Sequence, residues 1–248
     1  MNDGATTAIV VGASSGLGRA LATELARAHH ALLLIASDRR DLDALGASLN
    51  LEHGVAVRAL ALDLGREADP GARIVTALDG MPPVSALLLP IGYSREDDDL
   101  SLDAAGIGQL LAVNLHAPLA IVHALLPTLT EAHGTIVLFG SVAAARGRGR
   151  NVVYASAKRA LVSLYESLCQ RYRPRELRVQ MYLLGFVATN LTYGARLPLP
   201  SADPEVLART IVRRLGRGSS IRHLPRWWAL VTLIVRWLPW ALYRRLKG

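Results

Sequence analysis

The sequence predicts one α/β domain in which helices cover both faces of a parallel sheet. Apolar runs of strand length alternate along the 248 residues with longer segments of helical period. The run at residues 31–36 is continuously apolar, as a strand buried on both faces is. A glycine-rich turn joins the first apolar run to the first helical segment. Together these features are typical of a doubly wound, Rossmann-type parallel sheet.

The individual elements follow from these runs and periods. Strands are predicted at residues 6–12, 31–36, 55–62, 84–92, 134–141 and 177–185. Helices are predicted at residues 18–30, 39–52, about 105–132 and 152–172. Asp203 is the predicted N-cap of a further helix, because Pro204 suits the first helical position. The body of the protein is therefore expected to span residues 1–224, followed by a helical tail at residues 225–248.

Charge is distributed unevenly along the chain. The protein has 28 lysines and arginines against 20 acidic residues, a net charge of +8. Ten of the basic residues follow Glu205 and no acidic residue does, so the body is nearly neutral and the tail is cationic. A general affinity for nucleic acid needs a basic face on the body, so no nucleic-acid partner is predicted. No metal site is predicted either.

The cysteine content and the N-terminus indicate the compartment. The single cysteine, Cys169, cannot form an internal disulfide, which suits a reducing environment. The first twelve residues lack the basic and then apolar segments of a secretory signal. We therefore expect a cytoplasmic protein.

The tail is basic and aromatic, and it contains all four tryptophans within residues 226–245. Its apolar run is too short to span a bilayer, and Pro239 interrupts it. Tryptophan and arginine suit the headgroup level of a membrane. We expect two short helices that lie on an anionic membrane surface, which would place the protein at the inner face of the membrane. The alternative is that the tail packs against the body or against a second subunit of a homo-oligomer.

The glycine-rich turn at residues 10–18 predicts a dinucleotide site. Gly12, Gly16 and Gly18 stand between the first strand and the first helix, where glycine lets the backbone approach a pyrophosphate. The free N–H groups of the helix N-terminus favour an anion there. The residues expected to hold the pyrophosphate are Gly12, Ser14, Ser15, Gly16, Leu17 and Gly18.

The end of the second strand bears on the choice of dinucleotide. NAD-binding proteins usually carry an acidic residue there, whereas this chain has Ser37 and then Arg39. Arg39 or Arg40 could meet a 2′-phosphate, although both could equally be solvated residues of a helix. NADP(H) is therefore favoured, and NAD(H) stays possible because Asp38 lies nearby. Asp63, followed by Leu64, is expected over the adenine.

A tyrosine and a lysine one helical turn apart predict proton transfer. Tyr154 and Lys158 share one face of the helix at residues 152–172, so the ammonium can lie close to the phenol. A nearby cation stabilises a phenolate and is expected to lower the phenol pKa. Ser141 ends a strand, where its hydroxyl could hold a carbonyl oxygen, and Asn114 lies within the long helix.

The glycine turn, Asn114, Ser141 and the Tyr154–Lys158 pair together resemble the short-chain dehydrogenase/reductase family over residues 6 to about 220. The resemblance implies a hydride passed between a nicotinamide and a carbonyl or alcohol carbon. It implies that Tyr154 protonates the oxygen, Ser141 orients it, and Asn114 positions a water relay. Lys158 is implied to hold the nicotinamide ribose, and Gly92 and Thr189 to contact the cofactor.

The chain departs from the family pattern at two places. Pro90-Ile91-Gly92 replaces the frequent Asn-Ala-Gly, and Leu184-Gly185 replaces the frequent Pro-Gly. Neither change touches the proton-transfer residue.

The tail, together with Arg146, Arg148 and Asn151, is similar to one branch of that family, the reductases of decaprenylphosphoryl-2-keto-erythro-pentose. This similarity implies a ketone on a membrane-associated polyprenyl phosphate, with Arg146 and Arg148 at the lipid phosphate and Tyr154 at the ketone. A ketone on a lipid chain, such as a 3-keto-sphingoid base or a 3-ketoacyl group, is the alternative substrate. A non-catalytic, dinucleotide-sensing membrane scaffold is a third possibility. The acidic run at residues 95–99 is expected to be a solvated loop.

Overall fold

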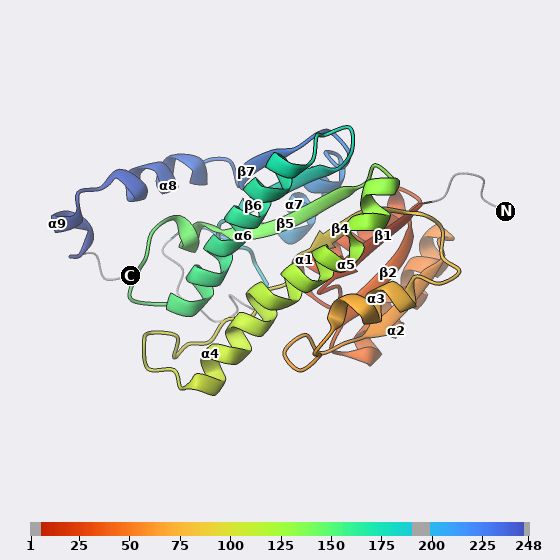
Figure 1. Cartoon of the computed structure of the whole chain (residues 1–248), viewed down its shortest axis with the longest axis horizontal. Coiled ribbons are helices and arrows are strands. Elements are labelled where there is room, and N and C mark those ends of the chain that lie inside the picture. The colour runs from red at the N-terminus through yellow and green to blue at the C-terminus, as the bar shows by residue number, and fades with distance from the viewer. Residues whose placement is uncertain (1–5, 190–198, 246–248) are drawn as a thin grey trace.

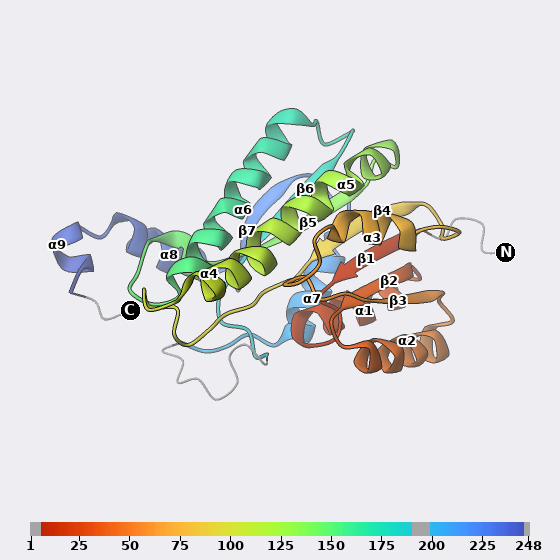
Figure 2. The ribbon, with the colours of Figure 1, turned by 60° about the horizontal axis from the view of Figure 1, so that its bottom comes forward.

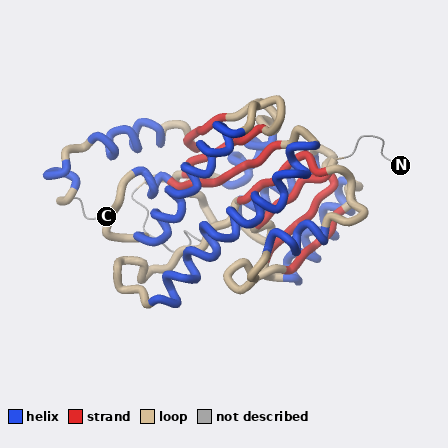
Figure 3. Tube along the Cα trace, viewed as in Figure 1, coloured by secondary structure: helices blue, strands red, loops and turns tan. Residues whose placement is uncertain are grey.

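The computed structural model describes residues 6–189 and 199–245, and its centre is a single parallel sheet. The sheet has seven strands in the order β3-β2-β1-β4-β5-β6-β7, and each neighbouring pair is parallel. The strands are β1 (Thr7–Val11), β2 (Ala31–Ala36), β3 (Val57–Ala61), β4 (Val84–Leu89), β5 (Thr135–Ser141), β6 (Arg178–Leu184) and β7 (Ser220–Leu224). The order reverses between β1 and β4, and Figure 3 shows the strands as one continuous layer. The predicted Rossmann-type fold is confirmed.

Helices cover both faces of this sheet, as Figures 1 and 2 show. One face carries α1 (Gly16–Arg27), α2 (Arg39–His53) and α7 (Pro204–Val212). The other carries α3 (Pro70–Ala77), α4 (Ala104–Leu111), α5 (Ala117–Glu131) and α6 (Val152–Arg171). Two apolar clusters, one on each side of the sheet, form the core. Every residue of β1 and β2 is buried, which explains why their sequences are apolar throughout.

Two elements were not predicted from the sequence, namely β7 and α3. The long predicted helix is also divided, because a π-helical turn, η1 (Ala112–His116), separates α4 from α5. Pro118 follows this turn and has no N–H group, so the Asn114 carbonyl within the turn lacks its usual α-helical donor. The combined segment Ala104–Glu131 is long and apolar enough to cross a membrane by length and composition, yet it packs against α3 and α6 in the core.

The tail forms two short helices, α8 (Trp228–Trp237) and α9 (Trp240–Tyr243), separated at Pro239. We call residues 226–245 the C-terminal strap; residues 246–248, the end of the predicted tail, lie outside the described residues. Figure 1 shows the strap at the end of the molecule opposite to the N-terminus. Trp228 and Thr232 are buried against the body, and Thr232 Oγ1 lies 2.9 Å from His223 Nε2. The alternative that the tail packs on the body therefore holds for one face of α8.

The opposite face of α8 is apolar and exposed. Leu230, Leu233, Ile234 and Trp237 recur at helical spacing, and Trp237 is 78% exposed. We call these four residues the outer stripe. One face of α8 is therefore covered by the body, and the outer stripe on its other face is suited to contact with another apolar surface.

Candidate active site

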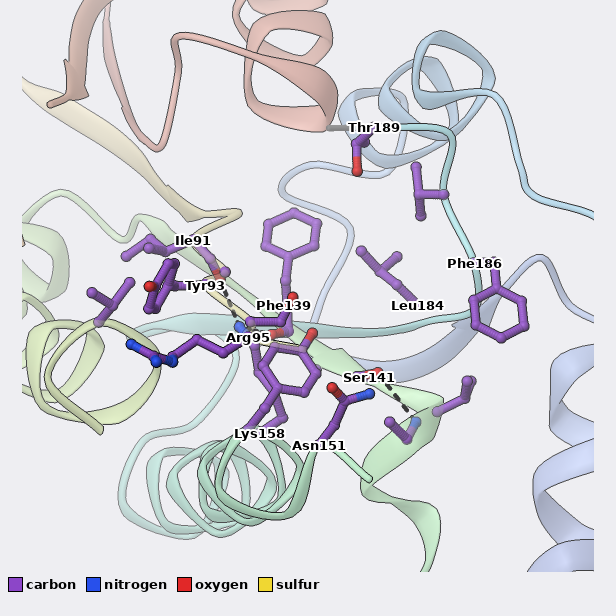
Figure 4. Close-up of a pocket in the computed structure, with 18 of the residues that line it drawn as sticks. Ile91, Tyr93, Arg95, Phe139, Ser141, Asn151, Lys158, Leu184, Phe186 and Thr189 are labelled. Atoms are coloured by element: carbon purple, nitrogen blue, oxygen red, sulfur yellow. Dashed lines mark hydrogen bonds between the residues drawn. The ribbon is translucent and has the colours of Figure 1, made fainter. Parts of the chain in front are cut away.

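Most of the predicted site residues line one large cleft at the carboxyl ends of the strands, and Arg39 and Asn114 lie outside its lining. The cleft has a volume of about 2250 Å³ and lies beside the point where the strand order reverses between β1 and β4. Open α/β sheets bind ligands at this place. Figure 4 shows Ser141, Asn151, Lys158 and Leu184 projecting into the cleft from β5, α6 and β6.

The glycine turn forms one wall of the cleft and fits a pyrophosphate. A Cβ atom on Gly18 would lie 1.9 Å from the Gly12 carbonyl oxygen, and one on Gly16 would lie 2.7 Å from Thr189 Cγ2. Gly12 and Gly16 also have positive φ angles, +92° and +50°. No side chain caps the first turn of α1, and that turn has no acidic residue. The helix N-terminus is therefore left open to an anion.

The end of β2 differs in part from the expectation. Ser37 lines the cleft, and Asp38 turns away from it to cap α2, where its carboxylate accepts from the Asp41 amide at 3.0 Å. Arg39 does not line the cleft; its guanidinium pairs with Asp43 at 2.7 Å on the exposed face of α2. In this structure Arg39 is thus a solvated helix residue, and any contact with a 2′-phosphate needs that pair to open.

The remaining predicted cofactor residues line the cleft. Asp63 and Leu64 follow β3, Gly92 follows β4, and Thr189 follows β6. The Asp63 carboxylate accepts from the Gly65 amide at 2.9 Å, so its own loop holds its position.

Lys158 is buried at the base of the cleft. It is 3% exposed, and its Nζ donates to the main-chain carbonyls of Ile91 at 2.6 Å and Phe139 at 3.3 Å. Those carbonyls lie at the ends of β4 and β5, so the side chain bridges two neighbouring strands (Figure 4). Burial lowers the pKa of the ammonium to about 8.

Tyr154 lies one turn before Lys158, and the ammonium is 5.8 Å from the centre of its ring. Burial raises the pKa of the phenol above its usual value, while a hydrogen bond with Ser141 and the charge of Arg148 lower it. The expected fall in this pKa therefore does not occur in this cleft, because desolvation outweighs the favourable charges. The neutral phenol that results is the form a proton donor requires.

Asn114 lies in the π-helical turn and is fully buried. Its amide nitrogen donates to the carbonyls of Tyr93 at 2.7 Å and Leu110 at 3.0 Å. Its amide oxygen accepts from the Tyr93 amide at 3.1 Å. Asn114 thus fixes the loop after β4, which lines the cleft, and the water relay implied for it stays a prediction.

The two arginines predicted at the substrate have different surroundings. Arg146 donates to the main-chain carbonyls of Val235 and Leu238, and its guanidinium lies 4.1 Å from the Tyr243 ring centre. It therefore fastens the strap to the loop at residues 146–150. Arg148 remains close enough to Tyr154 to lower its pKa, and it makes no ion pair within the described parts of the chain.

Two contributions to the site were missed by the sequence analysis. The strap forms a wall of the cleft through Trp228, Val235, Trp240, Tyr243 and Arg244. Asp98, in the run expected to be a solvated loop, is 1% exposed and contacts the start of α6. Both depend on contacts between residues far apart in the sequence, so no local pattern marks them.

A comparison with family models decides the family. The model described as short chain dehydrogenase matches residues 6–197, which is most of the chain. The chain belongs to the short-chain dehydrogenase family. It is therefore an oxidoreductase, and the predicted enzyme class is confirmed.

Individual relatives of this short-chain dehydrogenase are distant but cover much of its length. An uncharacterized oxidoreductase of Mycobacterium tuberculosis is 28% identical over 246 residues, 98% of each chain. The human very-long-chain 3-oxoacyl-CoA reductase is 25% identical over 238 residues, with 89% of this chain and 76% of that protein covered. A short-chain dehydrogenase from Sphingobium yanoikuyae, solved in complex with NADPH, is 28% identical with a TM-score of 0.82 and covers 98% of this chain and 96% of its own.

Proposed function

We propose that this short-chain dehydrogenase uses NADPH to reduce a ketone to an alcohol on an amphiphilic, membrane-associated substrate. The observation that carries the proposal is the placement of Tyr154, Ser141 and Lys158 in the cleft that the glycine turn borders. A nicotinamide dinucleotide, when bound, supplies the hydride, and the protein must supply the proton.

The cleft fits the dinucleotide by observations that do not depend on the family. Gly12 and Gly18 lie so close together that a side chain on Gly18 would collide with the Gly12 carbonyl. The N-terminus of α1 has no side-chain cap, so its N–H groups can bind a pyrophosphate. Ser14, Ser15 and Leu17 would hold the pyrophosphate, and Asp63 and Leu64 the adenine. NADP(H) is favoured by Ser37 in the cleft, by Asp38 turned away, and by the relative from S. yanoikuyae solved with NADPH.

The proton comes from Tyr154. Its phenol is neutral at pH 7 and lies with Ser141 at the cleft, so both hydroxyls can hydrogen-bond one carbonyl oxygen. The phenol would give its proton to the carbonyl oxygen, which becomes the oxygen of the alcohol. The ammonium of Lys158, held between two strands, stabilises the phenolate that is left.

Three arginines suggest an anionic group on the substrate. Arg148 and Arg150, in the loop between Ser141 and Tyr154, and Arg244 of the strap line the cleft. None of them is ion-paired within residues 6–189 and 199–245. Guanidinium groups bind phosphate through paired hydrogen bonds. A polyprenyl-phosphate keto-sugar meets these requirements, with Arg148 at the phosphate and Arg146 occupied by the strap.

The outer stripe supports docking on an anionic membrane rather than on a second copy of the chain. Arg226 and Arg236 flank it in the sequence, Arg244 and Arg245 follow α9, and no acidic residue follows Glu205. Two copies would therefore bring like charges together, whereas an anionic leaflet would attract them. Docking would place the mouth of the cleft, which the strap borders, at the lipid surface.

Reduction of a 3-ketoacyl group is the second candidate. It is supported by the similarity to very-long-chain 3-oxoacyl-CoA reductases, which is 25% for the human protein and 24% for the duck protein. A non-catalytic dinucleotide-sensing scaffold is disfavoured by the intact Tyr154, Lys158 and Ser141.

The substrate is tested with the full chain in detergent. NADPH oxidation is followed by absorbance with a polyprenyl-phosphate keto-pentose and, separately, with 3-oxohexadecanoyl-CoA. We expect the first ketone to be reduced, with Arg148→Ala raising its KM at least tenfold and leaving the affinity for NADPH unchanged. Turnover of only the second ketone would favour the second candidate, and turnover of neither would contradict the proposed function.

Docking is tested by sedimentation with phosphatidylglycerol vesicles, and phosphatidylcholine vesicles are the control. Truncation after residue 224 is a poor variant, because Trp228 and Thr232 are part of the folded body. The variant Leu230→Ser/Leu233→Ser/Ile234→Ser changes only exposed side chains. We expect wild type to sediment with the anionic vesicles and the variant to remain in solution. Equal sedimentation of the two proteins would remove the case for lipid docking.

A further inference from the structure

Asp98 is a buried carboxylate to which the mechanism above assigns no role. It lies in the loop between β4 and α4, and it is 1% exposed. Its neighbours Asp97 and Asp99 point outward: Asp97 pairs with Arg95 at 2.7 Å, and Asp99 accepts from the Ser101 hydroxyl at 2.7 Å. Asp98 makes no ion pair within the described ranges. A buried carboxylate needs other partners, because its desolvation is otherwise highly unfavourable.

Those partners are the free N–H groups at the start of α6. The Asp98 carboxylate accepts from the amides of Val153 and Tyr154, each at 2.9 Å, one on each oxygen. Its main-chain carbonyl accepts from the Val152 amide at 3.2 Å. The next amide, that of Ala155, makes the first bond inside the helix, to the Asn151 carbonyl at 2.8 Å. One residue, 54 to 56 positions earlier in the chain, thus satisfies the whole first turn of α6.

The helix cannot cap itself. A residue at the N-cap needs extended backbone angles before its side chain can reach the N–H groups. Asn151, which holds this position, has φ of 52° and ψ of 47°, and its side chain makes no capping bond. Its amide group instead projects into the cleft (Figure 4).

We propose that Asp98 is a positioning residue, which sets the location of the Tyr154 hydroxyl and leaves the Asn151 amide free to contact the substrate. The inference rests on the proposed function. The carboxylate holds the Tyr154 amide directly, so the start of the catalytic helix cannot fray or shift. It also ties the loop at residues 93–99 to that helix, and several residues of this loop line the cleft. A negative charge at the N-terminus of a 20-residue helix is favourable as well.

The test compares Asp98→Asn and Asp98→Ala with Asp69→Ala. Asp69 is the matched control, because its carboxylate caps α3 through the Ala72 amide at 2.9 Å, away from the cleft. Amide hydrogen exchange at Val153 and Tyr154 should rise about tenfold in Asp98→Ala, rise less in Asp98→Asn, and stay unchanged in Asp69→Ala.

A second readout needs no substrate. The ionisation of Tyr154 is followed by absorbance near 295 nm, as the difference from a Tyr154→Phe background. In Asp98→Ala the phenol should meet more water, so its pKa should fall toward the usual value, and Asp69→Ala should not change it. With the polyprenyl-phosphate keto-pentose, kcat should fall about tenfold while the KM for NADPH is unchanged.

The possible outcomes distinguish a failure of the positioning role of Asp98 from a failure of the proposed function. Wild-type exchange and an unchanged Tyr154 titration in both Asp98 variants would overturn the positioning role. If neither wild type nor variants reduce the ketone, the proposed function fails, while the exchange and absorbance data still decide the role of Asp98. If Asp98→Ala does not fold, the graded loss expected in Asp98→Asn remains to be measured.

Discussion

Substitution of Gly185 by alanine is predicted to loosen the strap from the body. A Cβ atom there would lie 1.8 Å from Trp228 Nε1 and 2.3 Å from Cδ1, whereas ordinary contact begins at 3.4 Å. The indole would have to retreat by roughly 1.6 Å, and a densely packed interior does not absorb such a shift. Trp228 is 5% exposed, so a displaced indole would expose apolar surface that is now almost wholly buried.

The size of the effect follows from that burial. Removal of a buried tryptophan typically destabilises by about 3–5 kcal/mol, which sets the upper limit for Gly185→Ala. At about 1.4 kcal/mol for each factor of ten, the detached population would rise by at most about two to three and a half powers of ten. A smaller rise is expected if the loop at Gly185 moves instead of the indole.

Limited trypsin digestion reports this population, because cleavage follows the opened state when opening is fast. We expect cleavage at Arg226 and Arg236 to accelerate at least tenfold in Gly185→Ala. Gly147→Ala is the control, since a Cβ atom there meets nothing within 4 Å. Cleavage of Gly185→Ala at the wild-type rate, with unchanged thermal stability, would refute the packing of Trp228 on Gly185.

Three further predictions concern the cofactor and the buried lysine. Burial lowers the pKa of Lys158 from 10.5 to about 8, so the unfolded chain binds more protons than the folded one between these pH values. The free energy of unfolding should therefore rise with pH from about 8 to 10.5. Denaturant titrations of Lys158→Met should not show this rise. Gly18→Ala should abolish NADPH binding in a fluorescence titration, because its Cβ atom would lie 1.9 Å from the Gly12 oxygen; wild-type affinity would show that the turn is not the pyrophosphate site. Arg39→Ala should leave the KM values for NADPH and NADH unchanged, because the Arg39 guanidinium pairs with Asp43 outside the cleft; a rise for NADPH alone would show that this pair opens to the 2′-phosphate.

Most of the sheet could be predicted, because each central strand is a short apolar run that can be recognised from its own residues. The runs at β1, β2, β4 and β5 are mostly apolar because helices cover both faces of the sheet, and the glycine turn stands between the first strand and the first helix. The edge strand β7 carries Arg222 and His223 and is only partly buried, so it lacks such a run. The short helix α3 has only eight residues, too few for a clear period.

The catalytic side chains could be predicted, but the residues that hold the catalytic helix and the strap in position could not. Tyr154 and Lys158 are one helical turn apart, so their proximity follows from the sequence. The bond from Asp98 to Tyr154 spans 56 residues, and that from Arg146 to Val235 spans 89. Only the folded chain brings these partners together. The direction of the Tyr154 pKa shift likewise depends on burial, which no spacing reveals.

Gly185, the residue of the Leu184-Gly185 pair that matches the family's frequent Pro-Gly, contacts the strap directly. The indole of Trp228 occupies the space that any side chain at position 185 would fill. Glycine at this position therefore allows the strap to form a wall of the cleft. The tail is thus part of the cleft wall, and its exposed outer stripe is the surface that we propose for docking.

The central claim is that Tyr154 donates the proton that completes ketone reduction. Its most direct test is Tyr154→Phe, with NADPH affinity measured by fluorescence and NADPH oxidation measured with the polyprenyl-phosphate keto-pentose and with 3-oxohexadecanoyl-CoA. We predict wild-type affinity for NADPH and at least about a hundredfold slower oxidation with whichever ketone the wild type reduces. Oxidation at the wild-type rate in Tyr154→Phe would contradict the claim.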